Sequence, residues 1–193
     1  MSRKLGRPIS RRAYAASLLT AVLALGGCMA RSIAPAVDGK DRVVDSRLVG
    51  RWQSDRGTET AVITARDSDY AVLYTDDKGE PGAFVGRLGR LGGRWVLDLA
   101  PQASGVQASD SYKGLLLPLH TFLLIDSIGA RMRVSAVKSD SVEGYLEREP
   151  SAVAHVKVDN EVVLTAPTPE LRAFLERYVT RPGVLEPQLW TRQ

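Results

Sequence analysis

The residue types that most often do chemistry are scarce in this 193-residue chain, which has two histidines and one cysteine. Histidine is the usual general base near neutral pH, so His120 and His155 are the first candidates for a catalytic or metal-ligating role. Each begins an apolar, strand-like stretch, and neither belongs to a helical His-x-x-x-His pair or a paired carboxylate motif. The sequence also lacks a Gly-x-Ser-x-Gly elbow and a phosphate-binding loop between a strand and a helix. We therefore expect no catalytic residue, no metal and no cofactor, and a protein that is not an enzyme.

Three arginines lie close together in the glycine-rich stretch GRLGRLGGR, namely Arg87, Arg90 and Arg94. In a hairpin their side chains could form a basic surface that meets lipid phosphates or an acidic protein partner. The alternative is a solvated face whose charge is balanced by nearby carboxylates. The sequence leaves both interpretations open.

The single cysteine, Cys28, follows an N-terminal leader. Residues 1–14 carry five basic and no acidic side chains, and residues 15–25 are mostly apolar, which is the pattern of a signal peptide. The apolar stretch is too short for a membrane-spanning helix, which needs about 20 residues. We expect residues 1–27 to be a signal peptide that is removed on export.

The boundary LGGC, Leu25 to Cys28, resembles the lipobox of bacterial lipoproteins. The resemblance implies that Cys28 becomes the lipidated first residue of the mature chain, so no thiol remains for a disulfide or for catalysis. Two or more acyl chains hold a protein on a bilayer, whereas one binds marginally. No aspartate follows Cys28, which favours the periplasmic face of the outer membrane. The stretch SRRAY also resembles the start of a twin-arginine signal, and the export route stays open between that system and general secretion.

Removal of the leader changes the charge balance. The whole chain has 26 basic and 22 acidic side chains, whereas the part from Cys28 onward has 21 and 22. The basic excess belongs to the leader, so we expect no nucleic acid partner. Residues 28–46 mix Ala, Pro, Gly and charge without a sustained period and predict a flexible tether. Residues 47–181 predict one folded domain, and residues 182–193 a C-terminal tail.

Alternation with period two dominates this domain. Runs of β-branched and aromatic residues separated by RDSD, DDKGEPG and LGG predict antiparallel hairpins, and four further strand candidates lie between residues 119 and 166. A short helix could start at Asp140. A longer one is expected at about 169–180, with Thr168 as its cap and one apolar stripe. Since such a stripe must pack on the sheet, we expect a mainly β fold, an antiparallel meander or small barrel with this helix packed on it.

The stretch LVGRWQSD at the start of the meander resembles the Gly-x-Trp opening of lipocalins, carried here by Gly50 and Trp52. The resemblance implies a lipocalin-like barrel whose closed end is plugged by Trp52. The chain departs from that family in having no disulfides and no recognisable second or third conserved loop motif. The candidate residues of the barrel interior are Trp52, Tyr70, Tyr74, Phe84 and Trp95.

Two functions from different classes fit these observations. One is a membrane-anchored periplasmic lipoprotein that binds a lipid or other small apolar ligand in the mouth of the barrel. The other is an accessory envelope lipoprotein that acts through protein–protein contacts, without catalysis. Whether the barrel interior is hollow or filled with side chains distinguishes them.

Overall fold

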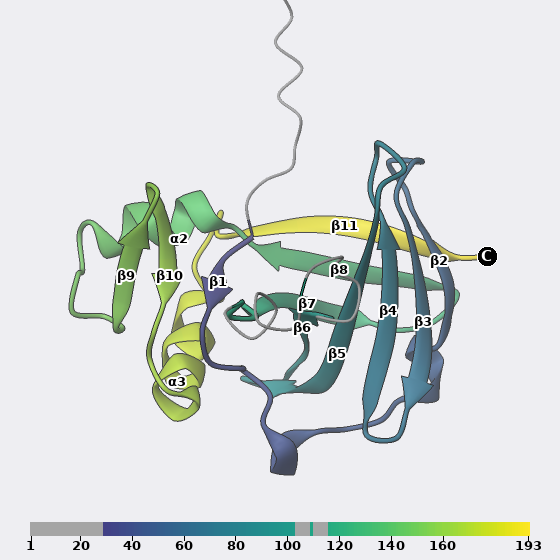
Figure 1. The fold of residues 1–193 in the computed structure, drawn as a ribbon, viewed down its shortest axis with the longest axis horizontal. Coiled ribbons are helices and arrows are strands. Elements are labelled where there is room, and N and C mark those ends of the chain that lie inside the picture. Colours follow the sequence, from purple (N-terminus) through teal and green to yellow (C-terminus); the bar gives the residue numbers. More distant parts are fainter. Residues whose placement is uncertain (1–28, 103–108, 110–115) are drawn as a thin grey trace, which may run out of the picture.

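A closed barrel of eight antiparallel strands forms the body of the protein (Figure 1). The computed structural model describes residues 29–102, 109 and 116–193. The strands of the barrel are β2 (Gly50–Ser54), β3 (Thr60–Arg66), β4 (Asp69–Thr75), β5 (Pro81–Leu91), β6 (Arg94–Pro101), β7 (Thr121–Ser127), β8 (Arg131–Val137) and β11 (Leu185–Arg192). Strands β2 to β8 follow one another in chain order, and β11 closes the barrel between β8 and β2. The predicted mainly β fold, with a small antiparallel barrel and a packed helix, is confirmed.

A second layer lies against the outside of one barrel wall, on the left in Figure 1. It contains a three-stranded sheet in the order β1 (Arg31–Ser32), β10 (Glu161–Leu164) and β9 (His155–Val158), together with the helices α2 (Ser139–Leu146) and α3 (Thr168–Tyr178). Two strands predicted near residues 155 and 161 therefore exist, but they pair outside the barrel. Neither α2 nor α3, the α-helices of the described residues, is long and apolar enough to cross a membrane.

The barrel wall between the two layers is buried on both faces. Successive residues of a strand point to opposite faces of the sheet, so Leu97 of β6 packs inside the barrel while Val96 packs against the outer layer. On β7, Ile125 likewise packs inside the barrel and Leu124 packs against the outer layer. The molecule therefore has two apolar cores that share one wall.

Helix α3 joins the second core through the predicted stripe, because Leu171, Phe174, Leu175 and Tyr178 are all buried. The predicted cap differs from the structure. Pro167 occupies the cap position, and the Thr168 hydroxyl donates instead to the carbonyl of Pro35 at 2.8 Å. The side chain expected to stabilise its own helix thus ties that helix to the N-terminal segment.

The segment expected to be a flexible tether is packed along the outside of the barrel. Backbone hydrogen bonds join Ala30 to Val137 and Ser32 to His120, and the 3₁₀ turns η1 (Gly39–Asp41) and η2 (Ser46–Leu48) follow. Ala30, Ser32, Ala36 and Val37 are buried. The prediction of a flexible tether is therefore wrong from Met29 onward. Contacts made by the backbone leave no periodic pattern in the sequence, so they could not be predicted from it.

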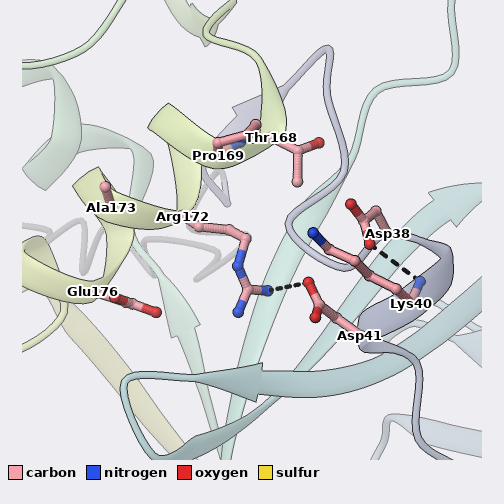
Figure 2. Close-up of a pocket in the computed structure, with 8 residues that line it drawn as sticks. All are labelled: Asp38, Lys40, Asp41, Thr168, Pro169, Arg172, Ala173 and Glu176. Carbon is pink, nitrogen blue, oxygen red and sulfur yellow. Dashed lines mark hydrogen bonds and ion pairs between the residues drawn. The ribbon is translucent and has the colours of Figure 1, made fainter.

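Arg172 of α3 holds this segment from the other side, as Figure 2 shows. Its guanidinium donates to the carbonyl of Ala36 at 2.7 Å and to that of Arg90 on β5 at 2.7 Å, and it lies 3.8 Å from the Asp41 carboxylate. A shallow groove of about 260 Å³ lies here between η1 and α3. Since Arg172 and Asp41 satisfy each other across it, we assign this groove a structural role.

The expected C-terminal tail is also corrected. Residues 185–192 form β11, which pairs with β8 over seven positions and with β2 over three. Its Pro187 pairs with Ser135 of β8 at a level where no β2 residue stands on the other side. Proline is tolerated there because the missing N–H would have no partner strand.

Candidate functional site

The lipidation candidate Cys28 lies outside the described residues, as does the predicted signal peptide 1–27. The first described residue, Met29, forms a backbone bridge with Lys138 at the end of β8. A lipid on Cys28 would therefore leave the protein directly at the rim of the barrel.

The predicted interior residues gather in one cluster on the inner face of the barrel. Trp52 and Tyr70 are fully buried, and Tyr74, Phe84 and Trp95 pack against the cluster while remaining partly exposed. The cluster also contains residues that the alternation pattern did not single out, among them Ile125, Met132, Val134 and Trp190. The five candidates are thus brought together as expected.

Gly86, which could have left a dent in this interior, sits in contact with its neighbours. A Cβ atom at this position would lie 3.2 Å from both Leu97 Cδ1 and Val72 Cγ2, and 3.4 Å from Leu99 Cδ2. Gly89 faces the other way, and a Cβ there would meet Val37 at 2.9 Å. Both glycines accommodate neighbouring side chains, one inside the barrel and one beneath the N-terminal segment.

The end of the barrel next to η2 is closed by polar contacts around Trp52. The indole of Trp52 donates to the carbonyl of Leu48 at 2.9 Å, and the Tyr70 hydroxyl accepts the N–H of Asp45 at 2.7 Å. Burial raises the pKa of Tyr70 above its ordinary value, so the phenol stays neutral. From outside, the Arg192 guanidinium lies 4.4 Å from the Trp52 ring and donates to the carbonyls of Arg47 and Val49. Arg192 was not among the predicted residues, because no sequence motif surrounds it.

The opposite end, the mouth, carries a polar network on the inner face. The hydroxyl of Tyr74 donates to Glu59 at 2.8 Å, and Gln188 donates to Ser54 at 2.6 Å and to the second Glu59 oxygen. Trp190 donates to Gln188 at 3.2 Å. Burial raises the pKa of Tyr74, and its hydrogen bond to Glu59 raises it further, so this phenol is a neutral donor. The network explains why β11 lacks a clean apolar alternation and was not predicted.

The three arginines of the candidate basic surface do not form a free patch. Arg94 pairs with Asp126 at 2.6 Å, and Arg87 lies 3.5 Å from Asp69. Arg90 stacks over the Trp95 ring at 3.4 Å. The solvated, balanced face is the interpretation that the geometry favours.

The two histidines differ in environment. His155 is partly exposed, with Nδ1 2.9 Å from the carbonyl of Val153. His120 is 8% exposed and Asp98 1%, and His120 Nδ1 lies 2.6 Å from Asp98 Oδ1. The other Asp98 oxygen accepts the N–H groups of Ala36 at 2.5 Å and Val37 at 3.2 Å. A carboxylate that accepts backbone N–H groups in this way fixes a segment of chain, so we assign the pair to docking of the N-terminal segment.

Among the described residues, no group of three or more His, Cys, Asp or Glu side chains is placed to hold a metal ion. In comparisons with known proteins, no family model, no curated protein and no solved structure matches this chain.

Proposed function

We propose that this protein is a lipid-anchored envelope lipoprotein on the periplasmic face of the outer membrane, and that it acts through contacts of its outer surface with an envelope protein. Cys28 carries the anchor in this proposal, and no step of catalysis is involved. The barrel is a rigid scaffold that presents its outer surface.

The observation that carries the proposal is the filling of the barrel interior. Large side chains from several strands are fully buried there, including Trp52, Tyr70, Leu88 and Ile125. At Gly86, where side-chain bulk is missing, the neighbours already lie at contact distance. An eight-stranded barrel is just wide enough either to fill with side chains or to hold one small ligand, and these contacts support the first case.

The anchor is supported by the leader and by the course of the N-terminal segment. The basic, apolar and small-residue regions that precede Cys28 resemble those of lipoprotein precursors. The chain from Met29 is fastened to the barrel at once, which suits a protein held close to a bilayer.

Binding of a lipid or other apolar ligand is the second candidate, and one observation favours it. The rings of Tyr74 and Phe84 are only partly buried, although both belong to the inner face of the barrel. They lie on adjacent strands near the mouth, so a small apolar molecule could cover them.

Native mass spectrometry of the protein extracted gently from membranes tests these alternatives. Our proposal expects the mass of the lipidated chain alone. A stoichiometric apolar molecule that is lost when Phe84 is changed to Asp would establish the ligand-binding function instead. Phe84→Leu is the matched control, because it keeps the apolar character of the mouth.

The anchor is tested by fractionation of cells that express the wild type or Cys28→Ser. We expect wild type in the membrane fraction and the detergent phase, and the serine variant uncleaved or soluble. A serine variant that is processed and still partitions like the wild type would contradict the lipobox assignment.

A further inference from the structure

A second hollow, unused by the proposed function, lies on the outer layer between α2 and the end of α3. Its volume is about 400 Å³, which falls within the range of small-molecule sites. The residues that line it include Asp140, Tyr145, Arg148, Tyr178 and Arg181. Three come from α2 or the residues just beyond it, and two from the end of α3 and the turn that follows.

Within the described part of the chain, no hydrogen bond or ion pair occupies the guanidinium group of Arg148 or Arg181, which both line this hollow. Arg181 is positioned by stacking over the Tyr145 ring at 4.6 Å, a contact that leaves its N–H donors available. Arg148 folds back toward Gly144, where a Cβ would lie 3.9 Å from its Nη1 atom. Seven other arginines, by contrast, form ion pairs with carboxylates.

Tyr178, one of the residues that line the hollow, has a hydroxyl without a hydrogen-bond partner among the described residues. Tyr178 is 2% exposed, and its hydroxyl oxygen is buried without a hydrogen bond to any described residue. Its ring is fixed by stacking on Phe174 at 5.2 Å and by contact with Tyr145 at 5.4 Å. A buried hydroxyl without a protein partner is satisfied by a water molecule or by a ligand.

The electrostatics of Tyr178 connect this hydroxyl to the charged side chains of the hollow. Burial raises the pKa of Tyr178 to about 12, so the group is a neutral donor under ordinary conditions. Asp140 raises this pKa further, while Arg181 and Arg148 lower it. The hydroxyl thus lies within the electrostatic reach of both free arginines.

The acidic residue of the hollow, Asp140, has a positive neighbour. One oxygen of Asp140 accepts the N–H of Ser141 at 2.7 Å, and the other lies 3.9 Å from Lys138 Nζ. The Asp140 side chain is 76% exposed, so water screens its charge. The hollow therefore combines two guanidinium groups with a single screened carboxylate, and Tyr178 adds a hydroxyl without a partner among the described residues. Arginine pairs of this kind suit phosphate, whose oxygens accept several N–H donors at once.

We propose that the hollow between α2 and α3 binds a phosphate group, held by Arg148 and Arg181 and by a hydrogen bond from the Tyr178 hydroxyl. Lys138 lies next to the hollow, since its Nζ atom is 3.9 Å from the Asp140 carboxylate, and its backbone also forms a bridge with Met29. The source of the phosphate is the headgroup of an anionic lipid. That choice of source rests on the proposed lipid anchor, whereas the phosphate site itself does not.

Calorimetric titration of the lipidated protein in a neutral detergent tests the site. The probes are inorganic phosphate and dihexanoylphosphatidylglycerol below its micelle concentration. We expect Arg148→Gln or Arg181→Gln to weaken phosphate binding about tenfold or more, since a charge-assisted contact is lost. Arg177→Gln is the matched control, because Arg177 belongs to α3, is exposed and does not line the hollow.

Tyr178→Phe separates binding from folding. Removal of an unpaired hydroxyl should leave the unfolding midpoint unchanged or raise it, yet weaken phosphate binding several-fold. Binding of both probes supports the site, and tighter binding of the lipid identifies the headgroup as its source. Equal binding by wild type and both arginine variants would overturn the proposal, as would no heat of binding at about 10 mM probe. The Cys28→Ser protein should bind phosphate like wild type, so failure of the anchor would be recognised separately.

Discussion

The Arg192 side chain contacts residues that lie far from it in the sequence. It covers the Trp52 ring and donates to two carbonyls around η2. These carbonyls belong to the end of a 3₁₀ turn, where no helical N–H is available to them. One side chain thus joins β11, β2 and the N-terminal segment at the closed end.

Replacement of Arg192 by Ala should lower the free energy of unfolding by about 1–3 kcal/mol, because two hydrogen bonds and a cation–π contact are lost. Chemical denaturation followed by tryptophan fluorescence measures the change. Arg133→Ala on β8 is the control, since Arg133 is exposed and forms no ion pair with a described residue. It should change stability by less than about 0.5 kcal/mol. Equal effects at the two positions would show that the contacts of Arg192 contribute nothing specific.

Of the two residues in this contact, Trp52 was predicted from the sequence and Arg192 was not. Trp52 was found because it stands in a short motif at the start of a β-domain. Arg192 was not found because its contacts are made with residues more than 130 positions away. Such a contact has no local signature, and neither has the pairing of Asp98 with His120.

The N-terminal segment is fastened to the barrel in part by one side chain, that of Asp98. Asp98 accepts two of its N–H groups and is itself fully enclosed. Removal of the Asp98 side chain would leave two buried N–H groups without an acceptor, at a cost of about 1–3 kcal/mol for each. We expect the loss of stability to appear first at the Ala36 and Val37 amides, which Asp98 holds.

We expect Asp98→Ala to speed hydrogen exchange at the Ala36 and Val37 amides by tenfold or more relative to amides of the barrel strands. Exchange measured by NMR or mass spectrometry resolves the two regions. Asp126→Ala removes an exposed pair with Arg94 and serves as the control, with an expected cost below about 1 kcal/mol. Uniform acceleration across the whole barrel would mean that the segment is not a separate unit.

Prediction at the level of elements succeeded where one face of a strand meets water. The hairpins from β2 to β6 follow the alternation, and the DN turn between β9 and β10 appears with Asp159 and Asn160 at positive φ. It failed for β11, whose inner positions include Gln188 in a polar network, and whose Pro187 argues against a central strand. It failed for the N-terminal segment because small residues and backbone bonds, rather than a periodic apolar face, hold it.

At the scale of the whole molecule, the packing of the barrel interior can be tested through stability, without any ligand. Gly86→Ala adds one methyl group where Leu97 and Val72 already lie at 3.2 Å. Overpacking of this kind costs about 1–3 kcal/mol. Gly39→Ala is the control, because a Cβ there meets nothing within 4 Å. We expect a lower unfolding midpoint for Gly86→Ala alone, and equal midpoints would indicate space in the interior.

The docked N-terminal segment also limits how far the barrel can move from residue 28, the proposed attachment point. A free linker of the 18 residues from Met29 to Ser46 would let the domain wander roughly 23 Å from its attachment point. With Met29 bridged to Lys138, the proposed lipid on Cys28 would leave only about one residue between the bilayer and the barrel rim. The domain would then keep a nearly constant height above the bilayer and a restricted tilt. Under the proposed function, a partner would have to present its contact surface at that height, so the docked segment would favour membrane-proximal partners over those deeper in the periplasm.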